Sequence, residues 1–248
     1  MTVTNEKEYE ALLRIGKIVG MTMKVMAEAM RPGMTTAELD AIGAAYMTAQ
    51  GARSAPQLVY KFPGATCISI NEEVAHGIPG SRVIKEGDLV NIDVSAELDG
   101  FFADTGGSFP VPPVKPEYAK ICNCAKAALQ KSIDAARTGQ RINAIGKAVE
   151  LQARSCGLTI IRELSGHGVG RSIHEKPNIP NFFTKRADER LTDGLVITLE
   201  PFITNGSGRV YTADDTWTIK TPDRDRTAQY EHTIIVRDGA PILVTAVD

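Results

Sequence analysis

Histidine, cysteine and tryptophan are scarce in this chain of 248 residues, with 4 histidines, 4 cysteines and 1 tryptophan. So few cysteines in a chain of this length do not form the dense disulfide framework of a small secreted domain. Cys122 and Cys124 are close, but their C-N-C spacing differs from the C-x-x-C pair of a structural zinc site. We therefore expect buried, free thiols, with Cys67 as a candidate pocket residue.

The chain also lacks a long apolar run, an apolar amino-terminal segment and a strong net charge. No segment approaches the roughly 18 apolar residues of a membrane span, and the first residues, MTVTNEKEYE, are polar rather than signal-like. The formal net charge of −2 gives no basic footprint for nucleic acid. We expect a cytoplasmic protein that binds neither membranes nor nucleic acid directly.

Helical and strand-like patterns alternate along the chain. Residues 6–30 carry apolar side chains at helical spacing, and Thr35 with Glu38 has the pattern of a capping box. The sequence DLVNIDVSAELDGFFADTGGSF predicts a hairpin that turns at Asp99-Gly100. The expected helices are 6–30, about 35–51, 117–136 and 141–156, with strands and turns over about 58–110 and from about 158 onward.

The order of two helices followed by strands occurs twice. Gly33 and Gly51 bracket the second helix, and Gly139 and Gly157 bracket the fourth with the same spacing. This second pair is shifted by 106 residues (139 − 33) from the first. Such self-similarity predicts two related halves.

A second correspondence has nearly the same offset. GDLVNID (87–93) matches GLVITLE (194–200), and each runs from a glycine through a strand to a carboxylate, Asp93 or Glu200. We expect an α/β domain in which two halves form one sheet core covered by helices, with the two carboxylates on either side of a shared cleft. The boundaries expected for this single domain and its halves are 1–248, about 1–113 and about 114–248.

Asp93 and Asp104 are expected to lie diagonally on one face of the hairpin. A two-residue turn pairs Ser95 with Asp104, and Asp93 is two residues from Ser95 on the same face. Two carboxylates this close repel unless one holds a proton or a cation lies between them. A solvated hairpin face is the structural alternative.

Two further acids lie in apolar strand-like segments. Glu200 ends GLVITLE, and Glu231 lies in AQYEHTIIV, so each is expected to be partly buried and to need a partner. His232, next to Glu231, should point to the opposite face and serve a structural role. Four acids and an imidazole such as that of His167 fit a site for two hard or borderline divalent cations.

The segment ELSGHGVGRSIHE (163–175) excludes two other sites. G-H-G-V-G is not G-x-G-x-x-G and leads into proline-rich sequence rather than a helix, so it does not indicate a nucleotide loop. His174-Glu175 starts an H-E-x-x-H motif, but Asn178 occupies its last position. The glycines instead predict a backbone held close to a neighbour. A two-metal phosphoesterase would need basic residues, and these motifs supply chiefly Arg171.

Five motifs in this order resemble those of type I methionine aminopeptidases. They are SINEEVAHGIPG (69–80), NIDVSAELDGFFADTGG (91–107), GHGVGRSIHE (166–175), ITLEPF (197–202) and AQYEHTI (228–234). The resemblance covers essentially the whole chain. It implies the pita-bread fold, in which two pseudo-symmetric halves build a curved, largely antiparallel sheet covered by helices.

The resemblance also implies a dinuclear metal site and a reaction. Asp104 and Glu231 would bridge two divalent ions (Mn, Fe, Co or Zn), with Asp93 on one ion and His167 and Glu200 on the other. A bridging water would attack the first peptide bond of a protein, and Glu200 would take its proton. His76 and His174 would contact the scissile peptide.

A methionine pocket and further properties follow from the same resemblance. The matching pocket residues are Tyr60, Phe62, Cys67, Ile173 and Trp217, and position 173 is often aromatic in the family. In some members the positions of Asn91, Val94 and Thr227 bind a monovalent cation through backbone oxygens. The implied activity removes the first methionine of nascent chains with a small second residue, by a monomer that can work beside the ribosome. The alternatives are another pita-bread exopeptidase, such as one preferring proline next to the cut, and a non-catalytic binding protein of this fold.

Overall fold

Two long helices at the start of the chain lie at the positions that the sequence predicts. The computed structural model describes residues 1–247, and in it α1 spans Glu6–Ala29 and α2 spans Thr36–Ala49. Asn5 caps α1 by accepting a hydrogen bond from the backbone N–H of Glu8. The expected capping box of α2 is confirmed, since Thr35 and Glu38 bind each other's backbone N–H groups.

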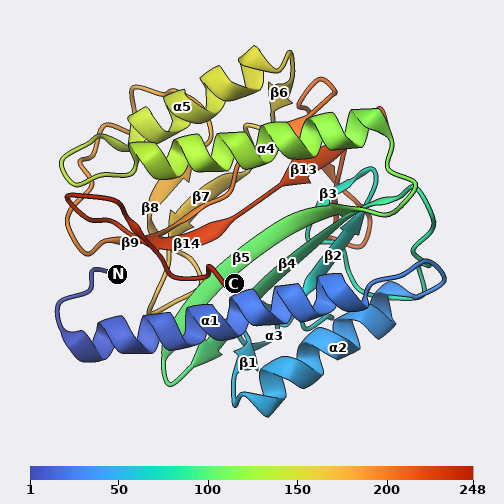
Figure 1. Ribbon diagram of the computed structural model, residues 1–248, viewed down its shortest axis with the longest axis horizontal. Coiled ribbons are helices and arrows are strands. Elements are labelled where there is room, and N and C mark those ends of the chain that lie inside the picture. The colour runs from blue at the N-terminus through green and yellow to red at the C-terminus, as the bar shows by residue number, and fades with distance from the viewer. Residues whose placement is uncertain (248) are drawn as a thin grey trace.

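The second helix pair repeats the first. Helix α4 spans Pro116–Ala135 and α5 spans Ile142–Ser155, close to the predicted ranges. Gly51 and Gly157, which follow α2 and α5, both have positive φ, at 76° and 65°. Figure 1 shows the pair α1 and α2 below the strands and the pair α4 and α5 above them.

The strands between the helix pairs form antiparallel ladders. The longest are β4 (Leu89–Leu98) and β5 (Phe101–Pro110), the predicted hairpin, in which Ser95 pairs with Asp104 as expected. Asp99 and Gly100 have positive φ, as a tight hairpin turn requires. Helix α1 packs against both strands of this hairpin.

The remaining strands of residues 1–247 complete sheets around this hairpin. In the first half these are β1 (Arg53–Ser54), β2 (Cys67–Ile70) and β3 (Glu73–Ala75). In the second half they are β6 (Thr159–Ile160), β7 (Ser165–Gly168), β8 (Glu175–Pro180), β9 (Val196–Leu199), β10 (Phe202–Thr204), β11 (Tyr211–Thr212), β12 (Ile219–Lys220), β13 (Thr227–Gln229), β14 (His232–Ile235) and β15 (Ile242–Leu243). One sheet has β5 beside β4, and another has the order β15-β14-β9-β7-β8.

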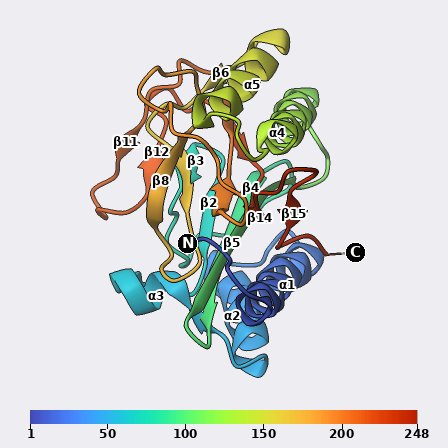
Figure 2. The same ribbon diagram turned by 90° about the vertical axis from the view of Figure 1, so that its left-hand side faces the viewer.

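The two sets of strands meet along β5. The backbone N–H of Asp104 donates to the hydroxyl of Thr233, which in turn donates to the carbonyl of Asp104. The backbone N–H of Glu231 donates to the carbonyl of Gly106. Figure 2 shows both helix pairs on one side of these strands. An acid of β5 and one of the segment before β14 lie close together.

A short helix, α3 (Ala55–Tyr60), lies where the sequence was expected to begin a strand-and-turn region. That expectation was wrong for residues 58–60. Ser54 caps the helix by accepting a hydrogen bond from the backbone N–H of Gln57, and Pro56 lies in its first turn. These signals were present in the sequence, but six residues are too few for helical periodicity to show.

Within residues 1–247, none of the helices combines the length and the apolar character that crossing a membrane requires.

Candidate metal centre

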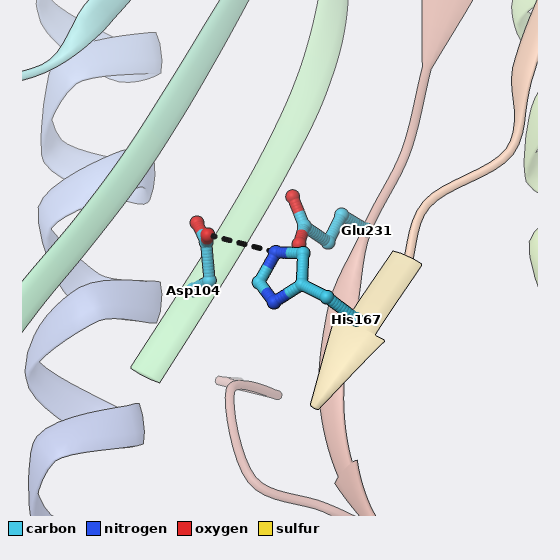
Figure 3. A group of neighbouring side chains, drawn as sticks. All are labelled: Asp104, His167 and Glu231. Carbon is cyan, nitrogen blue, oxygen red and sulfur yellow. Dashed lines mark ion pairs between the residues drawn. The ribbon is translucent and has the colours of Figure 1, made fainter. Parts of the chain in front are cut away.

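Three side chains from different strands and loops converge in a buried cluster. Asp104 comes from β5, His167 from β7 and Glu231 from the residue just before β14, and one ligand atom of each lies within 4.8 Å of the others (Figure 3). His167 Nε2 is 3.8 Å from Asp104 Oδ2. Oxygen and imidazole donors at this separation fit a divalent metal ion.

The two other predicted ligands join this cluster. Asp93 lies on β4, and its carboxyl group forms a hydrogen bond with that of Asp104. Glu200 follows β9, and its Oε1 lies 3.5 Å from His167 Nε2. The structure therefore brings all five predicted metal ligands together from both halves of the chain.

Neighbouring polar groups hold His167 in place. Its Nδ1 lies 3.0 Å from the backbone carbonyl of Gly168, which leaves Nε2 directed at Asp104 and Glu200. The hydroxyl of Thr198 accepts from the backbone N–H of His167 and donates to Glu200 Oε1, each at 3.0 Å.

Burial is the largest cause of the pKa shifts in the cluster. It raises the pKa of Asp93 to about 7, against the hydrogen bond from Asp104. Burial, reinforced by the neighbouring carboxyl groups, also raises the pKa values of Asp104, Glu200 and Glu231 well above their usual range. Burial, with His174 beside it, lowers the pKa of His167 to about 4, so its imidazole is neutral at pH 7, as metal ligation requires.

Two carboxylate oxygens of the cluster accept no hydrogen bond from the described residues. Asp104 Oδ1 and Glu231 Oε1 are buried and have no hydrogen-bond partner among the described residues. A buried unpaired carboxylate oxygen costs free energy. Cations bound among these oxygens would remove that cost and the repulsion between the acids, so the residues fit divalent metal ions.

The glycine-rich stretch beside the cluster is a strand end rather than the loop expected around His167. A side chain at Gly166 would collide with the carbonyl of Thr198, and one at Gly168 with the carbonyl of Lys176. The pairing of β7 with β8 shifts register between His167 and Gly168. The predicted close approach of backbone is confirmed, and it places His167 against β9.

A cavity of about 400 Å³ opens beside the cluster. The other predicted site residues line it, namely His76, His174, Tyr60, Phe62, Cys67, Ile173 and Trp217. The rings of Phe62 and Trp217 meet edge to face at 5.2 Å. Loss of hydration lowers the pKa values of His76 and His174, and for His76 the nearby His174 adds to this effect.

Two predictions concern residues outside the cavity. His232 has the expected structural role, since its Nδ1 lies 2.9 Å from the hydroxyl of Thr245. Asn91 and Val94 are three residues apart on β4, a strand that is paired on both sides. Thr227 lies on β13. That the backbone oxygens of these three residues bind one monovalent cation stays a prediction.

Sequence reasoning did not single out several residues that line the cavity or support the ligands. Ser95, Glu163, Asn178 and Phe202 line the cavity. Gln229 donates from Nε2 to Glu231 Oε2 at 2.9 Å. Gln229 lies two residues before Glu231 in a strand-like segment, so both side chains are on one face of the strand. This two-residue spacing is the sequence signal from which the contact could have been predicted.

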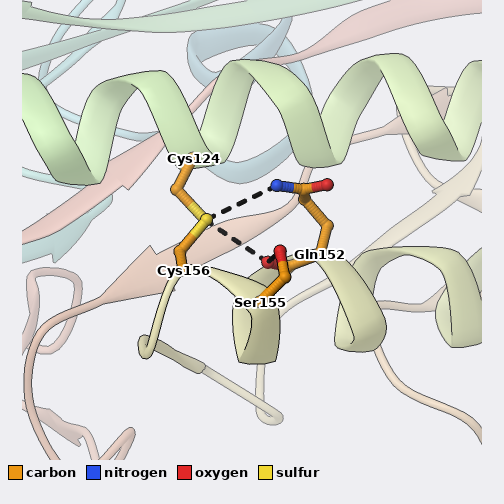
Figure 4. The surroundings of a disulfide bond; sticks show 4 residues. All are labelled: Cys124, Gln152, Ser155 and Cys156. Atoms are coloured by element: carbon orange, nitrogen blue, oxygen red, sulfur yellow. Dashed lines mark hydrogen bonds between the residues drawn. A yellow bond between two sulfur atoms is a disulfide. The ribbon is translucent and has the colours of Figure 1, made fainter.

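The expectation of free thiols is wrong for two cysteines. Cys124 on α4 and Cys156 at the end of α5 form a disulfide (Figure 4), because the packed helices bring their Cα atoms to 6.4 Å. Cys67 and Cys122 are buried and free, as expected. The sequence separation of 32 gave no sign of this contact between helices.

The sequence matches a family of metallopeptidases. Residues 10–238 match the model of metallopeptidase family M24. The chain is 49% identical over 247 residues to methionine aminopeptidase 2 of Bacillus subtilis, covering 99% of both chains. It is 46% identical over 250 residues to a methionine aminopeptidase of Staphylococcus epidermidis, covering 100% of both chains.

A solved structure has the same fold. The crystal structure of methionine aminopeptidase from Rickettsia prowazekii superposes with a TM-score of 0.95 at 33% identity, covering 99% of this chain and 100% of that one. The pita-bread fold expected from the sequence is confirmed.

Proposed function

Because this chain belongs to metallopeptidase family M24, we propose that it removes the amino-terminal methionine from nascent proteins and peptides whose second residue is small. The observation that carries the proposal is the buried cluster of Asp104, His167 and Glu231 at the wall of a cavity lined by apolar and aromatic side chains. The relatives of similar length that bear the name methionine aminopeptidase support the same activity.

The cluster would hold two divalent ions. Asp93, Asp104, His167, Glu200 and Glu231 would hold them, and Asp104 and Glu231 each offer an unsatisfied buried oxygen. Manganese, iron, cobalt and zinc all accept such donors. When bound, such ions polarise a carbonyl group and make a water molecule more acidic.

Glu200 is the residue we assign to proton transfer. Its carboxylate lies beside His167 and accepts a hydrogen bond from Thr198, which fixes one oxygen and leaves the other for a proton. Without metal, burial and the charge of Asp93 raise the pKa of this carboxyl group. Beside bound metal ions, a carboxylate at this place would be well positioned to accept a proton.

His76 and His174 would bind the scissile peptide group. Both line the cavity and both have lowered pKa values, so at neutral pH each ring is uncharged with one N–H to donate. His76 has a φ of 54°, a left-handed conformation that is uncommon for residues other than glycine. The turn before Gly77 therefore presents this ring at the expense of local strain.

The methionine side chain would lie among Phe62, Cys67, Ile173 and Trp217. Phe62, Cys67 and Ile173 are buried, and Trp217 is half-buried. A flexible thioether packs favourably against aromatic rings. We propose further that the protein acts as a monomer on new polypeptides in the cytoplasm.

The deciding experiment uses peptides and metals. Metal-free protein is incubated with Met-Ala-Ser, Ala-Ala-Ser or Ala-Pro-Ser, with Mn²⁺, Fe²⁺, Co²⁺ or Zn²⁺ added in turn, and the released amino acid is measured. We expect methionine release from Met-Ala-Ser alone. Equal release of alanine from Ala-Ala-Ser would show that the pocket is not selective. Cleavage of Ala-Pro-Ser alone would favour a proline-preferring exopeptidase, and no release with any metal would favour a binding protein.

A further inference from the structure

Tyr60 and His174 form a direct polar contact at the mouth of the cavity. The hydroxyl oxygen of Tyr60 lies 2.5 Å from Nδ1 of His174, across 114 residues of sequence. Their ring centroids are 5.5 Å apart and the ring planes are tilted by 50°. The contact is therefore a hydrogen bond at the edge of the imidazole rather than stacking, and it occupies one of the two ring nitrogens.

The backbone holds Tyr60 at this place. Tyr60 is the last residue of α3, and Lys61 after it adopts a left-handed conformation with φ of 61°. Such a conformation costs roughly 1 kcal/mol for a residue other than glycine. It ends the helix with a hydrogen bond from the N–H of Lys61 to the carbonyl of Pro56, so the phenol is presented by a helix fixed at both ends.

The backbone around His174 is held as well. Glu175 Oε1 accepts hydrogen bonds from the backbone N–H groups of Arg171 and Ser172, at 2.6 and 2.8 Å. The ring of His174 lies 4.2 Å from that of His167, centroid to centroid. Rotation of the imidazole about its side-chain bonds is the freedom that remains, and the Tyr60 hydroxyl restrains it.

We infer that Tyr60 is a positioning residue: its hydroxyl donates to Nδ1 of His174, so that Nε2 carries the ring proton and donates it to the scissile peptide group. The inference rests on the proposed function, in which His174 binds that group. It changes the role expected for Tyr60 from the sequence, which was to line the methionine pocket. A pocket residue affects KM through methionine binding, whereas a residue that orients His174 affects kcat.

Kinetics separate the two roles. Tyr60→Phe removes the hydroxyl and keeps the ring, and we expect kcat for Met-Ala-Ser to fall roughly 10- to 100-fold, the range typical for loss of an orienting partner, with KM within about 2-fold. Tyr211→Phe is the matched control, since Tyr211 is 50% exposed and Tyr60 41%, and it should leave both constants unchanged. An unchanged kcat in Tyr60→Phe, or an effect on KM alone, would overturn the inference.

A double-mutant cycle tests whether Tyr60 acts through His174. If it does, Tyr60→Phe has no further effect on kcat once His174→Ala is present. Independent effects that multiply would assign Tyr60 a separate role and reject the inference.

A spectroscopic measurement does not depend on activity. With only 4 histidines in the chain, ¹⁵N signals of the imidazoles can be assigned by single substitutions. At pH 8, His174 should show a protonated Nε2 and an unprotonated Nδ1 in the wild type, and a mixture of tautomers in Tyr60→Phe. Identical spectra would refute the inference. If the wild type releases no methionine but the spectra differ as expected, the proposed function fails and the positioning contact stands.

Discussion

Glu200 Oε1 lies 3.5 Å from Nε2 of His167, although 33 residues (200 − 167) separate them in sequence. Thr198 joins them from behind, accepting from the backbone of His167 and donating to the Glu200 carboxylate. One hydroxyl thus links the proposed metal ligand His167 to Glu200, the proposed proton acceptor. Glu200 is proposed both to bind metal and to accept a proton, and these two roles can be tested separately.

Glu200→Gln should abolish methionine release while the protein stays folded. The amide keeps the shape and one oxygen for a metal but cannot accept the proton, and loss of such a group costs roughly 10²- to 10⁴-fold in kcat. The measurement is the rate on Met-Ala-Ser together with bound Mn²⁺ and a thermal melt. Near-normal turnover would remove Glu200 from proton transfer, and loss of bound metal would assign the effect to ligation instead.

Asp104→Asn should weaken the response of the protein to metal and change the stability of the metal-free protein little. Asp104 is buried beside Asp93, Glu200 and Glu231, and the raised pKa of its carboxyl group means that the metal-free fold favours the neutral form. The amide is a neutral group of the same shape, so the Tm without metal should shift by no more than roughly 2–4 °C. Mn²⁺ should raise the Tm of the wild type by preferential binding to the folded state, and that of the variant far less.

The control for this comparison is Asp99→Asn, because Asp99 lies in the exposed hairpin turn with its side chain 73% exposed. Its melts should match the wild type with and without Mn²⁺. If Asp104→Asn responds to Mn²⁺ as strongly as the wild type, Asp104 is not a bridging ligand.

The hairpin shows how far local sequence reasoning reaches. Asp99-Gly100 specified a two-residue turn, the turn fixed the register, and the register placed Asp104 opposite Ser95 and near Asp93. Each step depends on neighbours in sequence, so the pair of carboxylates could be predicted. The offset between the halves similarly predicted that Asp93 and Glu200 serve one site.

Contacts between distant segments could not be predicted in this way. Tyr60 meets His174 because α3 ends at a left-handed Lys61, and neither the short helix nor its strained end has a periodic signal. Cys124 and Cys156 meet because α4 packs on α5 at one particular register. Such contacts depend on how helices and loops pack against one another. Resemblance to a family does not predict this packing at positions where the chain has residues of its own.

The disulfide between Cys124 and Cys156 should stabilise the fold without serving the reaction. It joins two helices on the outer side of the strands, away from the cavity. Its cysteines are 32 residues apart in sequence, and closing such a loop restricts the unfolded chain by roughly 4 kcal/mol. Dithiothreitol should lower the Tm of the wild type by several degrees and leave methionine release unchanged at 25 °C. The double variant Cys124→Ser/Cys156→Ser should melt at the lower temperature and no longer respond to dithiothreitol.

Glu175 should make the stability of the protein depend on acid pH. Burial alone would raise its pKa, but hydrogen bonds from the amino group of Met1 and the backbone of Ser172 and Arg171 outweigh it, so the pKa is lowered from 4.5. A carboxyl group with a lowered folded-state pKa stabilises the fold above its unfolded value and loses that contribution as the pH falls through the folded value. The stabilisation should therefore be complete above about pH 5 and decline below pH 4.5.

Urea unfolding of the wild type and of Glu175→Gln between pH 3 and pH 7 measures this contribution. The difference in unfolding free energy should be about 1 to 2 kcal/mol at pH 7, the value of hydrogen bonds to a charged group, and should shrink toward zero at pH 3. Glu86→Gln, at an exposed position, serves as the control and should follow the wild type throughout. If the difference in unfolding free energy stays constant from pH 3 to pH 7, the charge of Glu175 does not stabilise the segment that contains His174. The shape of the side chain would then account for the whole effect.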